Sequence, residues 1–319
     1  MAGSGSPRAK TALITAVVSA SIVLAGASGT AHAAWPGENG RIAFEVAGRI
    51  LSIQPSGAGQ RTLTAGPDDH APRWSPDGKR VVFERSGDLW LMRADGSHER
   101  RLTSGPGDDI TPGWSPDGTK VVFVRSDDGS DAGRSILVKP VAGGLPSRLT
   151  PADDGCAYAP TWTSTGRYVV FADICSVPFG NDVRKLRKVD TTTGAITTII
   201  PATGRPGPGG TWEFGGTAPD VSPDGRTVAF KADIVGADPC YIATTDLSGG
   251  NLRVITSSGD CGVFASDDPA FSPDGRKLTW TAGNENPQLD VIRLTDLQGR
   301  TIIWEGNSFP FNSDWQPRH

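Results

Sequence analysis

Histidine, methionine and tyrosine are scarce in this chain, which has four, two and three of them among its 319 residues. Only His70, His98 and the terminal His319 follow the N-terminal segment, so we do not expect a metal site built from several histidines. The sequence also lacks a Gly-x-Ser-x-Gly elbow, a His-Glu-x-x-His pair and a phosphate-binding loop. Without these motifs, we expect a protein that is not an enzyme and that needs no cofactor.

Long helical periodicity and an excess of positive charge are absent as well. The 41 glycines and 25 prolines interrupt short apolar runs throughout the chain, a pattern typical of an all-β domain. The formal net charge is −4, and it becomes about −6 when Arg8 and Lys10 are removed with the N-terminal segment. We do not expect a chain of this charge to bind nucleic acid.

The first 33 residues have the layout of a secretory signal peptide. Arg8 and Lys10 provide a basic start, residues 11–27 form an apolar run, and Ala31-His32-Ala33 offers a small-x-small cleavage site. The apolar run is short and rich in alanine, which favours cleavage over a membrane anchor. We therefore expect a secreted mature chain that begins at Ala34 and is not inserted in a membrane after cleavage.

One phrase recurs along the mature chain, and residues 112–123 carry it as Pro-Gly-Trp-Ser-Pro-Asp-Gly-Thr-Lys-Val-Val-Phe. Its Pro-Asp-Gly favours a tight turn, and the Val-Val-Phe that follows suits a buried strand. Further copies begin at Pro72, Pro160, Pro219 and Pro269, and the intervals between neighbouring copies are 40, 48, 59 and 50 residues. Each interval fits one four-stranded propeller blade with loops of varying length.

A sixth copy is divided between the two ends of the chain. Residues 313–317, Ser-Asp-Trp-Gln-Pro, supply its first half, and residues 39–44, Asn-Gly-Arg-Ile-Ala-Phe, supply its second half. Pairing the last strand with three N-terminal strands would close the ring and remove a free sheet edge. We therefore predict an all-β, six-bladed β-propeller over residues 34–319 with a split closing blade. The blades are expected at about residues 70–103, 110–150, 160–200, 217–256 and 267–305, with residues 308–319 plus 39–64 as the sixth.

The phrase Trp-Ser-Pro-Asp-Gly-(Lys/Arg)-x-(Val/Ile)-(Val/Ala)-Phe resembles the WD40-like (PD40) repeat of the TolB family of six-bladed propellers. The resemblance covers nearly all of the chain after the first thirty-odd residues, and it implies the propeller fold. It implies little about function, because propellers host unrelated activities. Repeat sequence starts close to the expected cleavage site and continues to the last residues. We therefore do not expect the α/β domain of TolB or the hydrolase domain of prolyl-oligopeptidase-like peptidases. Without the α/β domain, no Tol-Pal role is assumed.

Four cysteines suit an oxidising compartment. Cys156 and Cys175 flank a hairpin whose turn is Ser164-Thr165-Gly166, and Cys240 and Cys261 flank the outer hairpin of the next blade. We predict these two disulfides. A metal site that uses all four thiolates is the alternative, but the chain has no Cys-x-x-Cys pair to support it.

Each blade is expected to run through strands a, b, c and d from the channel outward. In the first blade, strand a ends at Trp74 and strands b, c and d cover residues 80–84, 88–92 and 99–102. Because strand directions alternate, the a–b and c–d turns lie on one face and the b–c and d–a connections lie on the other. The a–b and c–d turns are short, whereas the other connections include every long insertion. The long-loop face is therefore where we expect binding residues.

Acidic pairs precede the inner strand in four blades, and Asp314 stands alone in the closing blade. If the second members of the pairs converged on the channel mouth, they would form an acidic rim for a hard cation such as calcium or for a basic peptide. In the other interpretation, these aspartates hydrogen-bond the amides of their own loops. The candidate residues are Asp69, Asp109, Asp154 and Asp268.

Aromatic residues in two loops are further candidates for ligand contact. Trp212 and Glu213 lie in the Pro/Gly-rich residues 201–216, and Phe179 lies in residues 177–180. These aromatic rings would stack on a sugar or cover an apolar peptide side chain, or else pack against the propeller itself. The motif aromatics, such as Trp74 and Trp114, are assigned to packing between blades.

Three functions follow from these features. We favour a secreted, monomeric, non-catalytic propeller that binds a protein, peptide or cell-envelope partner through the long-loop face. The second is a metal-dependent propeller enzyme of the lactonase or lyase type, in which the four aspartates hold a cation. The third is a carbohydrate-binding module in which Trp212 and Phe179 share a cleft.

Overall fold

The computed structural model describes residues 37–127, 133–151, 156–175, 183–201, 205–207, 210–212, 214–234, 240–256, 268–282, 288–294, 301–306 and 310–319. The expected signal peptide, residues 1–33, lies outside these ranges. Within them, no helix has the length and apolar character needed to cross a bilayer. The described elements are β-strands joined by turns.

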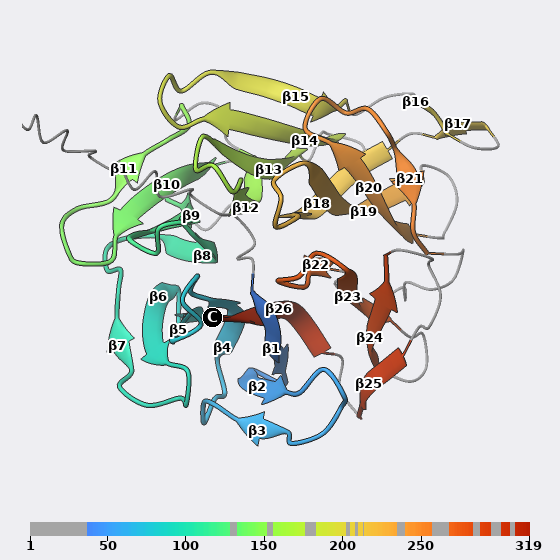
Figure 1. The fold of residues 1–319 in the computed structure, drawn as a ribbon. Helices are drawn as coiled ribbons and strands as arrows, with labels where there is room; N and C mark the ends of the chain where they lie inside the picture. Colours follow the sequence, from blue (N-terminus) through green and yellow to red (C-terminus); the bar gives the residue numbers. More distant parts are fainter. Residues whose placement is uncertain are drawn as a thin grey trace, which may run out of the picture. The chain divides into compact units, whose positions relative to one another are not determined.

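Six four-stranded antiparallel sheets form the structure, and each sheet is one blade (Figure 1). The inner strands touch one another in a closed cycle, from β4 (Asp69–Trp74) through β8 (Asp108–Trp114), β12 (Ala157–Trp162), β18 (Phe214–Val221) and β22 (Ala270–Phe271) to β26 (Pro310–Arg318) and back to β4. The prediction of an all-β, six-bladed propeller is therefore confirmed.

In the first five blades, the outer three strands follow the inner strand in chain order. In the first two blades they are β5 (Arg80–Arg85), β6 (Asp88–Arg93) and β7 (Arg100–Arg101), then β9 (Lys120–Ser126), β10 (Arg134–Pro140) and β11 (Ser147–Arg148). In the next three blades they are β13 (Tyr168–Cys175), β14 (Val183–Asp190) and β15 (Ile196–Ile200); β19 (Thr227–Ile234), β20 (Cys240–Asp246) and β21 (Arg253–Val254); and β23 (Lys277–Ala282), β24 (Gln288–Arg293) and β25 (Thr301–Glu305). A separate two-stranded sheet, β16 (Arg205–Gly207) with β17 (Gly210–Trp212), precedes the fourth blade.

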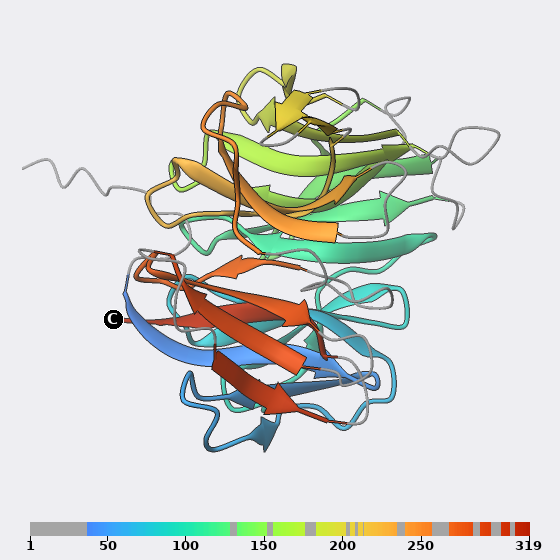
Figure 2. The same ribbon diagram turned by 90° about the vertical axis from the view of Figure 1, so that its right-hand side faces the viewer.

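The closing blade joins the two ends of the described chain, as the split repeat predicts. Strand β26 pairs with β1 (Glu38–Val46), which continues to β2 (Arg49–Ile53) and β3 (Arg61–Thr62). Both views show β26, in red, beside β1, in blue (Figure 1, Figure 2). Ile42 stands opposite Trp315 in this pairing. A Cβ atom at Gly40 would lie 2.6 Å from the carbonyl oxygen of Gln316, so the close approach of the two strands requires a glycine there.

The recurring turn owes its shape to a serine and a glycine. In the first blade, the amide of Gly78 donates to the carbonyl of Ser75 at 2.8 Å, and Gly78 has a φ of +64°, which favours glycine. The Ser75 hydroxyl donates to Asp77 at 2.6 Å and accepts from the amide of Arg80 at 2.9 Å. In the degenerate third copy, Thr163 replaces the serine and accepts from the amide of Tyr168 at 3.1 Å. A hydroxyl at this position therefore preserves the turn.

A second repeated contact ties strand d to strand c. A threonine that follows strand d accepts a hydrogen bond from a backbone amide at the start of strand c, as Thr103 does from Leu89 at 2.9 Å. The same contact occurs in the second, fourth and closing blades, from Thr150, Thr256 and Thr64. An apolar residue precedes each of these threonines; it is buried in three of the four blades, and Leu149 in the second blade is partly buried. This Leu/Ile-Thr pair is a second sequence repeat, and it marks the outer end of a blade.

The inner strands bulge at the residue before a proline or, in β26, before Ser313. Ala71, Thr111, Ala159, Ala218 and Asn312 all have positive φ values, between 46° and 52°. The pairing of each of these strands with its b strand shifts register at the same point. A bulge of this kind re-aims the side chains that follow it. It decides which residue of each inner strand faces the channel.

Trp315 is the main apolar anchor of the ring closure. It is 2% exposed, packs with Ile42, Phe44 and Leu289, and donates its indole N–H to Thr279 at 3.1 Å. We expect Trp315→Ala to lower the free energy of unfolding by ~3–5 kcal/mol, because it empties a packed site at the seam. Denaturant titration measures the change. Leu145→Ala, at a side chain that is 90% exposed, is the control and should shift it by less than ~0.5 kcal/mol. Equal unfolding midpoints for the two variants would contradict this role.

One of the four cysteines has a described side chain. Cys156 is disulfide-bonded, directly before β12, and its carbonyl accepts a hydrogen bond from the amide of Ile174 at 2.9 Å. Ile174 is the neighbour of Cys175 on β13, so the backbone brings the predicted partner close to Cys156. Cys240 stands opposite Asp233 at the start of β20, and Cys261 lies outside the described residues.

The disulfide pairing can be tested by peptide mapping. We expect non-reducing digestion and mass spectrometry of the purified chain to give one peptide pair that joins Cys156 to Cys175 and another that joins Cys240 to Cys261. A peptide pair that crosses between the two blades, such as Cys156 with Cys240, would refute the predicted connectivity.

Candidate functional site

The central channel is lined in each inner strand by the residue that precedes the motif aromatic, or that precedes Val221 in the fourth blade. These residues border a narrow cavity of about 70 Å³. A water molecule needs roughly 10–15 Å³ of such space, so the cavity holds a few waters and is far below the roughly 300–1,000 Å³ of typical ligand sites. The six positions are Arg73, Gly113, Thr161, Asp220, Ala270 and Asp314.

The described lining of this channel contains three aspartates, Asp220, Asp268 and Asp314, and one arginine, Arg73. Asp220 and Asp314 each accept a backbone N–H from the next blade, from Phe271 at 2.7 Å and from Trp74 at 2.6 Å. Burial raises the pKa of Asp220 to about 6 and that of Asp314 to about 7, although these hydrogen bonds and the charge of Arg73 oppose the shift. The Arg73 guanidinium donates to the carbonyl of Asn312 at 3.2 Å. The channel carboxylates therefore hold neighbouring blades together.

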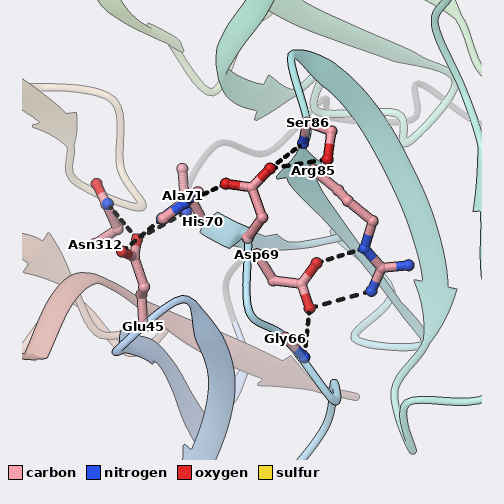
Figure 3. A network of polar contacts seen from close by, with 9 residues as sticks. Glu45, Gly66, Asp69, His70, Ala71, Arg85, Ser86 and Asn312 are labelled. Carbon is pink, nitrogen blue, oxygen red and sulfur yellow. Dashed lines mark hydrogen bonds and ion pairs between the residues drawn. The ribbon is translucent and has the colours of Figure 1, made fainter.

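A wider pocket of about 290 Å³ lies at one end of the inner strands. Its residues stand at the ends of b strands or the starts of a strands, so it opens on the face with the b–c and d–a connections. Four blades contribute to it, and Figure 3 shows the part around Glu45 and His70. The lining side chains with polar or aromatic groups are Glu45, His70, Glu84, Thr111, Tyr158, Phe311 and Asn312. We call this site the mouth pocket.

Two glutamates in the mouth pocket occupy equivalent positions in adjacent blades. Glu45 and Glu84 each follow the buried phenylalanine of strand b, and each accepts the amide of the bulged residue in the next blade. The amide is that of Ala71 for Glu45, at 3.2 Å, and that of Thr111 for Glu84. Glu45 also accepts from His70 Nδ1 at 2.7 Å and from Asn312 Nδ2 at 3.1 Å (Figure 3).

The protonation of these groups depends on burial and on one another. Burial raises the pKa of Glu84 to about 7, the Thr111 amide opposes the shift, and the charge of Glu45 adds to it. Burial lowers the pKa of His70, but the hydrogen bonds to Glu45 and Asp68 and the charges of Glu45 and Glu84 outweigh this and raise the pKa overall. The mouth pocket therefore changes charge near neutral pH.

Two of the predicted rim aspartates are engaged within their own blades. Asp69 is fully buried and forms an ion pair with Arg85, with Arg85 Nη2 at 3.1 Å from Oδ2, and it also accepts the amide of Gly66 (Figure 3). Asp109 is 1% exposed and forms the equivalent pair with Arg125, at 2.6 and 2.7 Å. Both bidentate pairs lie in cross-strand register, so these two carboxylates are oriented toward strand b.

The other predicted site residues are placed differently. Asp268 lines the channel cavity, where burial raises its pKa and Arg73 opposes the shift. Asp154, Phe179 and Glu213 lie outside the described residues, and so does the side chain of Trp212, which ends β17. Among the side chains that are described, no three histidines, cysteines or acids lie close enough to hold one metal ion.

The residues of the mouth pocket and channel were not identified by motif searching. Their signal is the variation at two positions of an otherwise regular repeat. The residue after the b-strand aromatic is Glu45, Glu84, Val124, Ala172, Lys231 and Thr281 in the six blades, and the residue before the a-strand aromatic varies in the same way. An alignment of the six copies would have identified these residues, because charged side chains occur at these two positions in some blades and not in others.

The raised pKa values predict an unusual pH dependence of stability. When the pKa of a carboxyl is raised in the folded state, the free energy of unfolding falls as pH rises from the pKa of the unfolded chain to the pKa of the folded chain. For Asp314 these pKa values are about 4 and about 7. We expect Asp314→Asn, which stays neutral while its side-chain oxygen can accept the Trp74 amide, to flatten this decline by up to about 1.4 kcal/mol per pH unit. Urea unfolding at a series of pH values measures the slope, with the exposed Glu38→Gln as the control. Identical slopes for Asp314→Asn and the parent chain would show that Asp314 is not responsible.

Solved structures with this architecture include two TolB proteins. TolB from Acinetobacter baumannii has a TM-score of 0.71 and 18% sequence identity, and the match covers 88% of this chain and 67% of that one. A putative TolB from Agrobacterium tumefaciens has a TM-score of 0.65 and 20% identity, over 87% of this chain and 99% of that one. An oligogalacturonate lyase in complex with manganese has a TM-score of 0.50 and 18% identity, over 84% and 85%. At these identities the likeness concerns the fold.

A search of curated proteins found no match. The model of the PD40 family, described as the TolB beta propeller domain, matches residues 42–201, which include the N-terminal strands of the closing blade and the first three blades. This match spans just over half of the chain. Together with the closed ring of six blades, it shows that the chain belongs to the TolB β-propeller family.

Proposed function

We propose that this chain is an exported, non-catalytic propeller that binds a protein or peptide partner through its long-loop face. The observation that carries the proposal is the mouth pocket, an open site of about 290 Å³ lined by residues of four blades. The cavity in the channel has a volume of only about 70 Å³, which is too small for most ligands, so a ligand would bind at the mouth. A rigid ring that presents a pocket among long connections is a common arrangement for recognition.

Two features of the chain support export. The N-terminal sequence has the features of a signal peptide, and Cys156 is disulfide-bonded. Structural disulfides persist mainly in oxidising compartments. We therefore propose an extracytoplasmic location for the mature chain and a partner that shares that compartment.

Site-specific photo-crosslinking in the native host tests which face binds. A benzoylphenylalanine is placed at Asp127 or at Leu145, two positions on opposite faces of the second blade. Asp127 follows strand b and its side chain is 57% exposed, whereas Leu145 lies on the c–d turn and is 90% exposed. We expect a discrete crosslinked partner from position 127 and none from position 145.

Two results would overturn the proposal. One is crosslinking from position 145 alone, which would assign binding to the short-turn face. The other is the absence of a crosslinked partner from position 127 while the variant is exported and folded. Calorimetric titration of the purified chain with calcium is a parallel measurement, and strong binding there would instead favour a metal-dependent activity.

A further inference from the structure

The mouth pocket carries a partly buried acid, Glu84, whose hydrogen-bonding capacity is only partly used. Glu84 lines the pocket and accepts one hydrogen bond in the described part of the chain, from the amide of Thr111 to Oε1. Its other oxygen, Oε2, accepts none there. Glu45 differs, because His70 occupies its Oε1 and the amides of Ala71 and Asn312 occupy its Oε2. Glu84 is therefore the carboxylate that is available to a ligand.

The charges around Glu84 favour a cationic ligand. Glu45 and Glu84 line the same pocket, and Asp68 stands beside His70 at 3.3 Å. The positive groups that act on Glu84 already have other contacts: His70 lies within hydrogen-bonding distance of Glu45 and Asp68, and Arg73 donates to the carbonyls of Pro72 and Asn312. Burial raises the pKa of Glu84 to about 7, and the charges of His70 and Arg73 oppose this shift without cancelling it.

The walls of the pocket suit a long side chain with a charged end. Tyr158, Phe311 and Ile110 offer apolar surface, and the two rings can also attract a cation through their faces. The pocket volume of about 290 Å³ is near the lower end for ligand sites, which matches one side chain better than a folded segment. Lysine and arginine combine an apolar stem with a charged end in this way.

The same geometry argues against the other classes of ligand. A hard metal ion takes six to eight oxygen ligands, and the described side chains offer no group of three acids or histidines for one. An anion would face both glutamates. A neutral sugar would leave the Glu84 carboxylate without a counter-charge. Building on the proposed function, we infer that the mouth pocket receives a lysine or arginine side chain of the partner, with Glu84 as its counter-ion.

Short peptides with one variable residue test this inference directly. The probes are acetyl-Gly-X-Gly-amide peptides in which X is Arg, Lys, Gln or Glu, titrated into the full mature chain labelled with ¹⁵N-histidine. His70 lines the pocket and reports binding through its imidazole resonances, which are assigned by their loss in His70→Gln. We expect saturable shifts with the Arg and Lys peptides and none with the Gln and Glu peptides.

Variants then identify the counter-ion. Glu84→Gln keeps an oxygen that accepts the Thr111 amide but has no charge, and we expect it to weaken binding of the Arg peptide by roughly tenfold or more. Glu305→Gln is the matched control, since Glu305 is exposed on the outer strand of the fifth blade, and it should leave the affinity unchanged. Thermal unfolding of both variants confirms that they are folded.

Three outcomes would overturn the inference. They are equal binding of the Gln and Arg peptides, no saturable shift with any peptide, and unchanged Arg-peptide affinity in folded Glu84→Gln. If Glu84→Gln does not fold, the comparison of the four peptides on the parent chain still decides. Crosslinking from position 127 that persists in these cases would leave the proposed function standing while the cationic ligand is rejected.

Discussion

The pairing of β26 with β1 is the constraint on which the rest of this structure depends. A single chain can make a closed ring of sheets only if strands from its two ends share a blade, and here Ile42 and Trp315 stand opposite each other in that blade. Closure removes the edges that an open arc of blades would leave unpaired. It also gives every blade two neighbours, so each inner strand is packed from both sides.

Ring closure also builds the mouth pocket. Glu45 comes from β1, Asn312 from β26 and His70 from β4, and these three residues meet only because the last and first blades adjoin. The carboxylate of Asp314 bridges the same seam one residue deeper, through the amide of Trp74. The candidate site and the ring closure thus lie at one place, and the most polar part of the pocket lies where the two ends of the described chain pair with each other.

The regular and the variable positions of the repeat have separate roles. In the five undivided copies of the repeat the turn glycine is constant, and the motif aromatic and the turn serine are replaced once each, by Val221 and Thr163, because these residues build each blade in the same way. The position after the b-strand aromatic lines the mouth pocket in the closing and first blades and is under no such restriction, so glutamates occur in these two adjacent blades and aliphatic residues in the next two. A symmetric scaffold therefore carries an asymmetric, acidic sector.

Cross-strand register explains why the predicted acidic rim differs from the observed arrangement. Asp69 and Asp109 precede Arg85 and Arg125 by sixteen residues, and the hairpin between them places each aspartate directly opposite its arginine. Counting residues back from the turn would have revealed both ion pairs. The rim interpretation relied instead on the clustering of acids in the sequence, which does not say which way a strand residue points.

The sequence by itself determined the number of blades, the split closing blade, the turns and the buried aromatics, because each depends on short-range patterns that repeat. Tertiary structure decided which polar side chains face the axis. One bulge in each of five inner strands rotates the chain before it reaches the channel, and the neighbouring blade then supplies the hydrogen-bond partner. Contacts between blades join residues far apart in the chain, as Asp314 and Trp74 are, and no local pattern encodes them.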